Sequence, residues 1–203
     1  VGLIVEQMDD SVADPEVKDA ILSATSVLGG LGASVEEVSV PLVKHGMLLT
    51  IILMGVEPAL DHHQWVKNSV QDYLPPNRMG LLTGSVMPAQ AYYKAQKLRS
   101  LLRQQIKEAL ESYDVLVAPT LGRTAQKIEG YAKVPLRSRQ YLLTTAFSLA
   151  SVPAISVPCG LSPQGLPIGF QIGGRPGSEE TLLRVAHAYE RNTTWHTMRP
   201  PTV

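Results

Sequence analysis

Apolar residues occur along the chain in two patterns: short continuous runs of strand length, and stripes at helical spacing. Short apolar runs at 2–5, 115–118 and 154–158 predict buried strands. A turn over 162–165, with Pro and Gly in turn positions, leads into a further predicted strand at 168–172. Uninterrupted apolar runs suit strands that are covered on both faces, so the pattern predicts a sheet between helices.

Helical spacing begins after the first strand. Asp14, Pro15 and Glu16 predict a helix start, because Asp suits the cap, Pro the first turn and Glu the positive end of the dipole. Glycines at 29–32 predict its end, and a strand is predicted over 35–40. The apolar stripe of this helix consists of Val17, Ala20, Ile21, Ala24 and Leu28. Strand, helix and strand in forty residues predict a parallel, right-handed crossover.

The remaining helical patterns are less regular. Four further helices are predicted, over 42–70, over 88–112, over 138–150 and after Ser178. The first of them is expected to break near Gly55 and Pro58, and the segment 73–77 is predicted to be a loop. The long connection 121–135 leaves the end of a buried strand, where ligands bind in open α/β sheets, so it is a candidate pocket wall.

Composition narrows the class of protein. The 203 residues suggest one domain or a piece of one, and 44% hydrophobic residues can form a core. With 18 basic and 18 acidic residues the net charge is zero, which gives no electrostatic footprint for nucleic acid or an anionic membrane. The longest apolar run, 47–56, is shorter than the about 18 residues of a membrane span. One cysteine excludes an internal disulfide and favours a reducing, cytoplasmic setting.

Two small groups of residues suggest chemistry on their own. Asp61, His62 and His63 resemble a metal cluster, but neighbouring helical side chains point about 100° apart, so we favour a solvated helix and expect no metal. Cys159 has no histidine within 25 positions, so a buried structural thiol is favoured over a nucleophile. His187 lies off its helix's apolar stripe and is expected at the surface.

Four stretches together resemble a known family. SLASVPAISVPCG (148–160) and GLPIGFQIGGRP (165–176) are similar to the closing third of amidase-signature enzymes. TLLRVAHAYE (181–190) resembles the helix that follows in that family, and YDVLVAPT (113–120) resembles its "D-x-L-x-x-P-T" wording. The resemblance covers nearly the whole chain and is specific in combination.

This resemblance implies a fold and a place in a longer protein. The expected fold class is α/β, with a mixed, largely parallel sheet flanked by helices on both faces, incomplete in this chain. Residues 1–203 are expected to be the C-terminal portion of a single amidase-signature domain. The Gly/Ser-rich run with two catalytic serines, and the catalytic lysine, are expected upstream, so no catalytic residue is assigned here and this chain alone is expected to be inactive.

The resemblance also suggests residues that face the substrate. Tyr141 occupies a position that is acidic in glutamine-using amidotransferase subunits and apolar in fatty-amide hydrolases. Ser138, one turn earlier, and Thr120, at a strand end, are further candidates for substrate binding. Arg78 falls near a basic position that holds the glutamine carboxylate in amidotransferases. For all four, ordinary surface or core packing is the alternative.

The family's pattern is not kept everywhere. Ser148 and Ser151 stand where the family has Asn and Gly, and Leu121-Gly122-Arg123 replaces a Pro-containing loop. The expected function is hydrolysis of a small-molecule amide to a carboxylate and ammonia, without a cofactor. The alternatives are the A subunit of a glutamine-dependent aspartyl/glutamyl-tRNA amidotransferase, which Tyr141 disfavours, and a non-catalytic binding domain. Direct nucleic-acid and membrane partners are not expected, whereas a homo-oligomer or association with the N-terminal part is.

Overall fold

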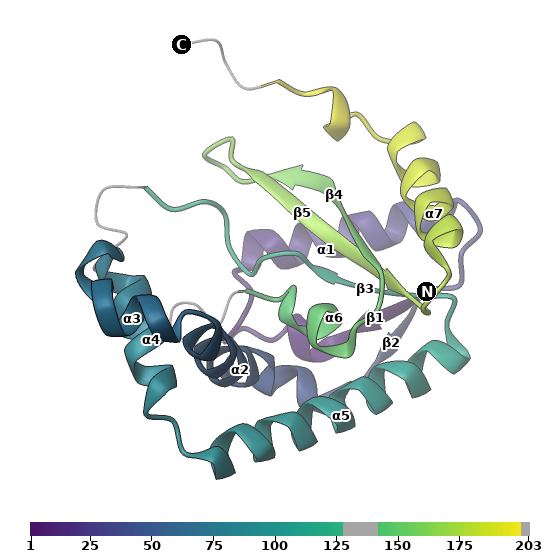
Figure 1. Cartoon of the computed structure of the whole chain (residues 1–203). Helices are drawn as coiled ribbons and strands as arrows, with labels where there is room; N and C mark the ends of the chain where they lie inside the picture. The colour runs from purple at the N-terminus through teal and green to yellow at the C-terminus, as the bar shows by residue number, and fades with distance from the viewer. Residues whose placement is uncertain (128–141, 200–203) are drawn as a thin grey trace.

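A mixed five-stranded sheet forms the centre of the computed structural model, which describes residues 1–127 and 142–199 (Figure 1). The strands lie in the order β2-β1-β3-β5-β4. Their bounds are β1 Gly2–Ile4, β2 Glu36–Val38, β3 Val115–Pro119, β4 Ala154–Leu161 and β5 Pro167–Gly174. The predicted strands are therefore all present, and the α/β class with a mixed sheet is confirmed.

The two halves of the sheet are paired differently. β1 pairs in parallel with β2 and with β3, and the helix α1 (Pro15–Gly30) connects β1 to β2 as the predicted crossover. β3 pairs antiparallel with β5, which forms a hairpin with β4. Gly165 in the turn of that hairpin has φ +77°, a conformation that glycine adopts without a Cβ clash. Because β1 and β3 are parallel, their carboxyl ends lie side by side at the same end of the sheet.

Helices cover both faces of the sheet (Figure 1). α1 and α7 (Glu179–Arg191) pack on one face, and α2 (Gly46–Asp61), α5 (Ala89–Ser112) and α6 (Thr145–Ala150) pack on the other. Strand β3 serves both cores: Val115 and Val117 belong to the first, and Leu116 and Ala118 to the second. This division explains why all residues of β3 are buried and why its sequence shows no polar alternation.

Two short helices follow α2 in the chain: α3 (His63–Ser69) and α4 (Pro75–Ser85), which packs beside α2. We call α3 and α4 the helical extension. Short 3-10 turns occupy Val5–Gln7, Pro41–His45, Val70–Asp72 and Trp195–Thr197. The loop predicted over 73–77 is confirmed only at Tyr73 and Leu74, because α4 begins at Pro75 with prolines in its first turn. Proline fixes a helical φ and lacks the N–H that a first turn leaves unpaired.

The expected break near Gly55 and Pro58 was also wrong. α2 runs through both residues and ends at Asp61, where His62 becomes its C-cap. Gly55 lies against α4 instead: a Cβ on Gly84 would come 1.8 Å from the Gly55 carbonyl oxygen. Gly55 and Gly84 therefore mark a close backbone crossing of two helices and not a helix end.

The ends of two other helices differ from the prediction. The helix predicted over 138–150 is seen as α6 from Thr145, since 142–144 are not helical and 128–141 lie outside the described residues. α6 ends at Ala150, and its C-cap Ser151 has a left-handed φ of 56°. This is the position where the resembling family has glycine. Ser178 precedes α7 as expected, but its hydroxyl donates to the Arg175 carbonyl and does not cap the helix.

α2 also bears on the question of a membrane. Within residues 1–127 and 142–199, the stretch Pro41–Asp61 alone has the length and apolar composition of a span, with mean hydropathy 1.4. Core helices pass the same test, so this evidence is weak. Val43, Leu49 and Leu53 from this stretch pack into the core against the sheet, and 28% of the apolar window is buried.

Large apolar side chains are nevertheless exposed around this helical extension. We call them the α2–α4 apolar surface: Met54, Leu60, Trp65, Leu74, Met79 and Val86, all more than 60% exposed. β4 is also an edge strand in the described sheet. The structure thus contains the exposed apolar residues and the open strand edge expected of an incomplete sheet.

The glycine crossing gives a matched test. We expect Gly84→Ala to destabilise the chain by about 1–3 kcal/mol, because its methyl group would overlap the Gly55 backbone. Gly80→Ala is the control in the same helix, since a Cβ there meets nothing within 4 Å. It should be neutral or stabilise by up to about 1 kcal/mol through helix propensity. Urea unfolding of both variants measures the difference, and equal stabilities would contradict the close crossing.

Candidate functional site

The candidate site lies where the parallel strands β1 and β3 end. Ligands in open α/β sheets bind beyond the carboxyl ends of strands. Here β1 leads into the 3-10 turn Val5–Gln7, and β3 leads into Thr120, whose N–H donates to the Gly169 carbonyl at 2.9 Å. The segment 142–145 packs over the same ends.

Two buried glutamines fix that segment. Gln7 Nε2 donates to the Leu143 carbonyl oxygen at 2.8 Å, and Gln171 Nε2 donates to the same oxygen at 3.1 Å. Gln171 also donates to the Pro119 carbonyl at 3.0 Å. The two glutamines are only 2% and 3% exposed, so these bonds are shielded from water. The ends of β1 and β3 are thereby joined to β5 and to the start of α6.

Two hydroxyl groups meet beside this network. Thr120 Oγ1, just after β3, and Ser156 Oγ, near the start of β4, lie 2.6 Å apart across the intervening strand β5. Gly169 of β5 lies between them, and a Cβ there would come 3.2 Å from Ser156 Oγ and 3.3 Å from Thr120 Oγ1. The absence of a side chain at Gly169 therefore leaves room for the pair. Both hydroxyls can donate to and accept from a ligand.

Two cavities open on either side of Ser156. One, of about 420 Å³, is lined by Thr120, Leu121, Arg123 and Pro158 together with Ser156. The other, of about 310 Å³, is lined by Thr144, Phe147, Ser148 and Gln171 together with Ser156. These volumes are in the range of small-molecule sites, and each combines apolar walls with a few polar groups. Leu121 and Arg123 place the start of the loop 121–127 in a cavity wall, as predicted.

The structure separates the residues that the sequence suggested for substrate binding. Thr120 lies at the candidate site. Tyr141 and Ser138 lie outside the described residues. Arg78 lies on α4, where its Nη2 donates to the carbonyls of Gln71 and Tyr73 at 2.9 and 3.1 Å. Its Nε is buried without a partner in the described part of the chain.

Ser156 and Gln171 were not predicted as site residues. Gln171 gave a signal that could have been used, because it is the one strongly polar residue in the apolar run 168–172. A polar residue in a buried strand must find a hydrogen-bond partner, which makes it informative. Ser156 gave no comparable signal, since its role depends on which residue of β3 lies beside it.

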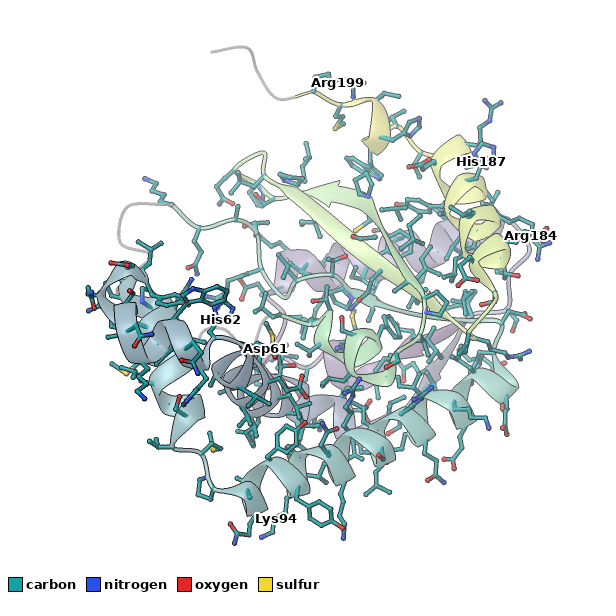
Figure 2. The ribbon with its side chains drawn as sticks, viewed as in Figure 1. Asp61, His62, Lys94, Arg184, His187 and Arg199 are labelled. Atoms are coloured by element: carbon teal, nitrogen blue, oxygen red, sulfur yellow. The ribbon has the colours of Figure 1, made fainter. Side chains whose placement is uncertain are left out.

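The other chemical candidates lie elsewhere. His62 Nδ1 is 2.8 Å from the Tyr73 hydroxyl, in the helical extension, and no group of three metal-ligating side chains occurs within 1–127 and 142–199. His187 points outward from α7, away from the sheet (Figure 2). Cys159 is buried in the core between the sheet and α1, and burial raises the pKa of its thiol to about 12. This thiol is a poor nucleophile.

Comparison with known proteins agrees with this architecture. A family model described as Amidase matches residues 1–183. The A subunit of glutamyl-tRNA(Gln) amidotransferase from Listeria monocytogenes is 33% identical over 98% of this chain and 46% of its own length. The chain thus spans about half the length of the curated relatives it matches.

Solved structures show the same fold. A crystal structure described as an amidase has a TM-score of 0.83 at 27% identity, over 94% of this chain and 45% of its own. The A subunit of glutamyl-tRNA(Gln) amidotransferase from Thermotoga maritima has a TM-score of 0.75 at 27% identity, over 95% of this chain and 42% of its own. The amidase-signature fold expected from the motifs is confirmed.

The buried thiol predicts slow chemistry. At pH 8 a thiol with a pKa of about 12 is a thiolate about one part in ten thousand, and only the thiolate is alkylated. We expect Cys159 to resist iodoacetamide in the folded chain and to react readily in guanidinium chloride, where its pKa returns to about 8.5. Mass spectrometry of the labelled protein measures both rates. Rapid labelling of the folded chain would show that Cys159 is accessible and activated.

The glutamine network predicts a loss of stability. Gln171→Met should lower the free energy of unfolding by about 1–3 kcal/mol, because the Pro119 and Leu143 carbonyls each lose a buried side-chain donor, and Leu143 keeps Gln7 and the longer bond from the Ala146 N–H. Gln164→Met, in the exposed hairpin turn, is the control and should change stability by less than about 0.5 kcal/mol. Chemical unfolding compares the two variants. If the Gln171→Met chain were as stable as the control, the glutamine network would not contribute to the stability of the fold.

Proposed function

Because this chain belongs to the amidase family, we propose that it is the C-terminal part of an enzyme that hydrolyses a small-molecule amide. The products are a carboxylate and ammonia, and linear amides are the proposed substrate class. The match of the family model over residues 1–183 carries this proposal. Residues 1–203 would form the C-terminal portion of a single amidase-signature domain, with the catalytic portion preceding them.

The proposed mechanism divides the work between the two portions. Amide hydrolysis needs a nucleophile, a base and donors for the oxyanion. A serine, a second serine and a lysine of the preceding portion would supply these groups, since no catalytic residue is assigned in this chain. The serine oxygen adds to the amide carbonyl, the C–N bond breaks as the nitrogen takes a proton, and water then releases the acid from the acyl-enzyme. No cofactor is needed for these steps.

This chain would supply the substrate-facing wall. Thr120 and Ser156 offer two hydroxyls between cavities of about 420 and 310 Å³. Tyr141 and Ser138 remain proposed contacts on sequence grounds. Arg78 remains proposed, on sequence grounds, to hold a substrate carboxylate; its Nη2 donates to two carbonyl groups and its Nε is buried.

The remaining surfaces suggest how the portions associate. The α2–α4 apolar surface and the free edge of β4 favour association with the N-terminal portion or with a second copy of the chain. The zero net charge supports a protein without direct nucleic-acid or membrane partners. A cytoplasmic location is proposed from the lone, unpaired cysteine.

A second candidate function is that of the amidotransferase A subunit. The Listeria relative, which is 33% identical, favours it. Tyr141 disfavours it, since an acidic residue at this position would pair with the ammonium group of glutamine. Glutaminase activity that depends on a partner protein would favour this second function over the first. A third candidate, a non-catalytic binding domain, would require that no serine-rich stretch precede this chain in its gene.

Activity of a longer polypeptide tests the proposal. We expect the product of the upstream-extended reading frame to release ammonia from simple aliphatic or aryl amides, and the 203-residue chain alone to release none. Ammonia release measures both. Turnover by the 203-residue chain alone would contradict the division of work. The absence of a serine-rich stretch upstream would contradict the proposal that the protein is an enzyme.

The wall residues can be tested in the same longer protein. Thr120→Val and Ser156→Ala should each lower kcat/KM by about tenfold, the value of one hydrogen bond to substrate. Ser100→Ala is the control, since this exposed hydroxyl of α5 contacts only its own helix at the Gln96 carbonyl. Unchanged kcat/KM in both site variants would assign the hydroxyl pair to packing alone.

A further inference from the structure

A third cavity, of about 300 Å³, opens at the carboxyl end of β1. Its walls include Gln7, Asp9, Lys44, Met47, Leu142 and Thr145. It is distinct from the cavities that share Ser156, which have none of these residues in their walls. It nevertheless touches the same segment, because Leu142 and Thr145 border this cavity and Thr144 borders the cavity beside Ser148.

The side-chain amide of Gln7, a buried polar group in the wall of this cavity, has only part of its hydrogen bonds. Gln7 is 2% exposed, and its Nε2 is occupied by the Leu143 carbonyl. Its Oε1 has no hydrogen-bond partner among residues 1–127 and 142–199. A buried acceptor without a donor costs free energy, and buried polar groups are usually satisfied by protein donors or bound water. The cavity wall at Gln7 is therefore suited to a ligand with an N–H or O–H group.

Charged groups at the rim narrow the choice of ligand. The Asp9 carboxylate accepts the Ser11 N–H and hydroxyl on Oδ1, and Oδ2 has no bond among the described residues. The Ser11 hydrogen bonds, aided by the Lys44 charge, lower the pKa of Asp9, so this carboxylate is ionised at neutral pH. Glu6 also borders the cavity, but its carboxylate accepts from Ser39 Oγ at 2.5 Å and Val40 N at 2.8 Å. Asp9 and Lys44 are thus the opposite charges presented to a ligand.

We propose that this cavity binds a small zwitterion that carries a primary ammonium group and a carboxylate. The ammonium donates to Gln7 Oε1 and Asp9, and the carboxylate accepts from Lys44. Met47 and Leu142 contact the carbon chain between the two groups. A neutral amide would satisfy Gln7 and leave both charges unused, so the zwitterion is the better match. This binding site does not depend on the amide hydrolysis proposed above.

The test uses 4-aminobutyrate as the probe and the full 203-residue chain. Titration through the millimolar range, followed in ¹H–¹⁵N spectra, should shift the amides of Gln7, Ser11 and Lys44. The half-charged analogues n-butylamine and butyrate should bind about tenfold more weakly or worse, because each lacks one charge-assisted hydrogen bond. Shifts confined to Ser156 and Gln171 would place the probe in the other cavities and overturn the proposal, as would no binding.

Two exposed substitutions identify the groups that bind. Asp9→Asn and Lys44→Gln should each weaken 4-aminobutyrate binding by about tenfold or more, without loss of folding. Asp19→Asn and Lys67→Gln are the matched controls, since these exposed residues lie outside the cavity wall. In addition, n-butylamine binding should fall with Asp9→Asn and should not fall with Lys44→Gln, because a cation gains no bond from Lys44. Equal affinity of all four variants for the zwitterion would overturn the proposal.

Discussion

The carbonyl oxygen of Leu143 is the point on which the candidate site depends. Two amide groups from distant parts of the chain, Gln7 and Gln171, donate to it in a region shielded from water. In such surroundings a hydrogen bond is electrostatically stronger than in water, and its loss leaves a buried carbonyl with fewer donors. The segment before α6 is thus positioned by polar bonds and not by apolar packing alone.

This constraint accounts for the arrangement of the cavities. Gln171 reaches both Leu143 and Pro119 because β5 is inserted antiparallel between β3 and β4. The same insertion places Gly169 beneath Thr120 and Ser156, so the hydroxyl pair forms beside the network. Cavities lie on both sides of the segment 142–145: Leu142 and Thr145 border one, and Thr144 borders the other.

Much of the fold could be predicted because local patterns and tertiary packing agree there. The apolar run of β3 and the apolar stripe of α1 each predict burial from the local sequence alone, and both are buried as expected. Prediction failed where a contact with a distant residue or a position within a helix determines the structure. Gly55 predicts a helix break, but it is needed because α4 crosses there, and Pro75 predicts a loop, but it lies in the first turn of a helix. Thr120 was predicted as a candidate from its strand end, whereas the position of Ser156 beside it depends on the register of β4.

The glycine crossing of α2 and α4 has a mechanical consequence. No side chain cushions the contact between Gly55 and Gly84, so the two helices cannot slide past one another by changing rotamers. At its other end α2 also approaches the segment 142–145 closely, since a Cβ on Gly46 would come 2.6 Å from Thr145 Oγ1. A displacement of Thr145 would therefore press on the start of α2, and the contact of Gly55 with Gly84 would pass that displacement on to α4.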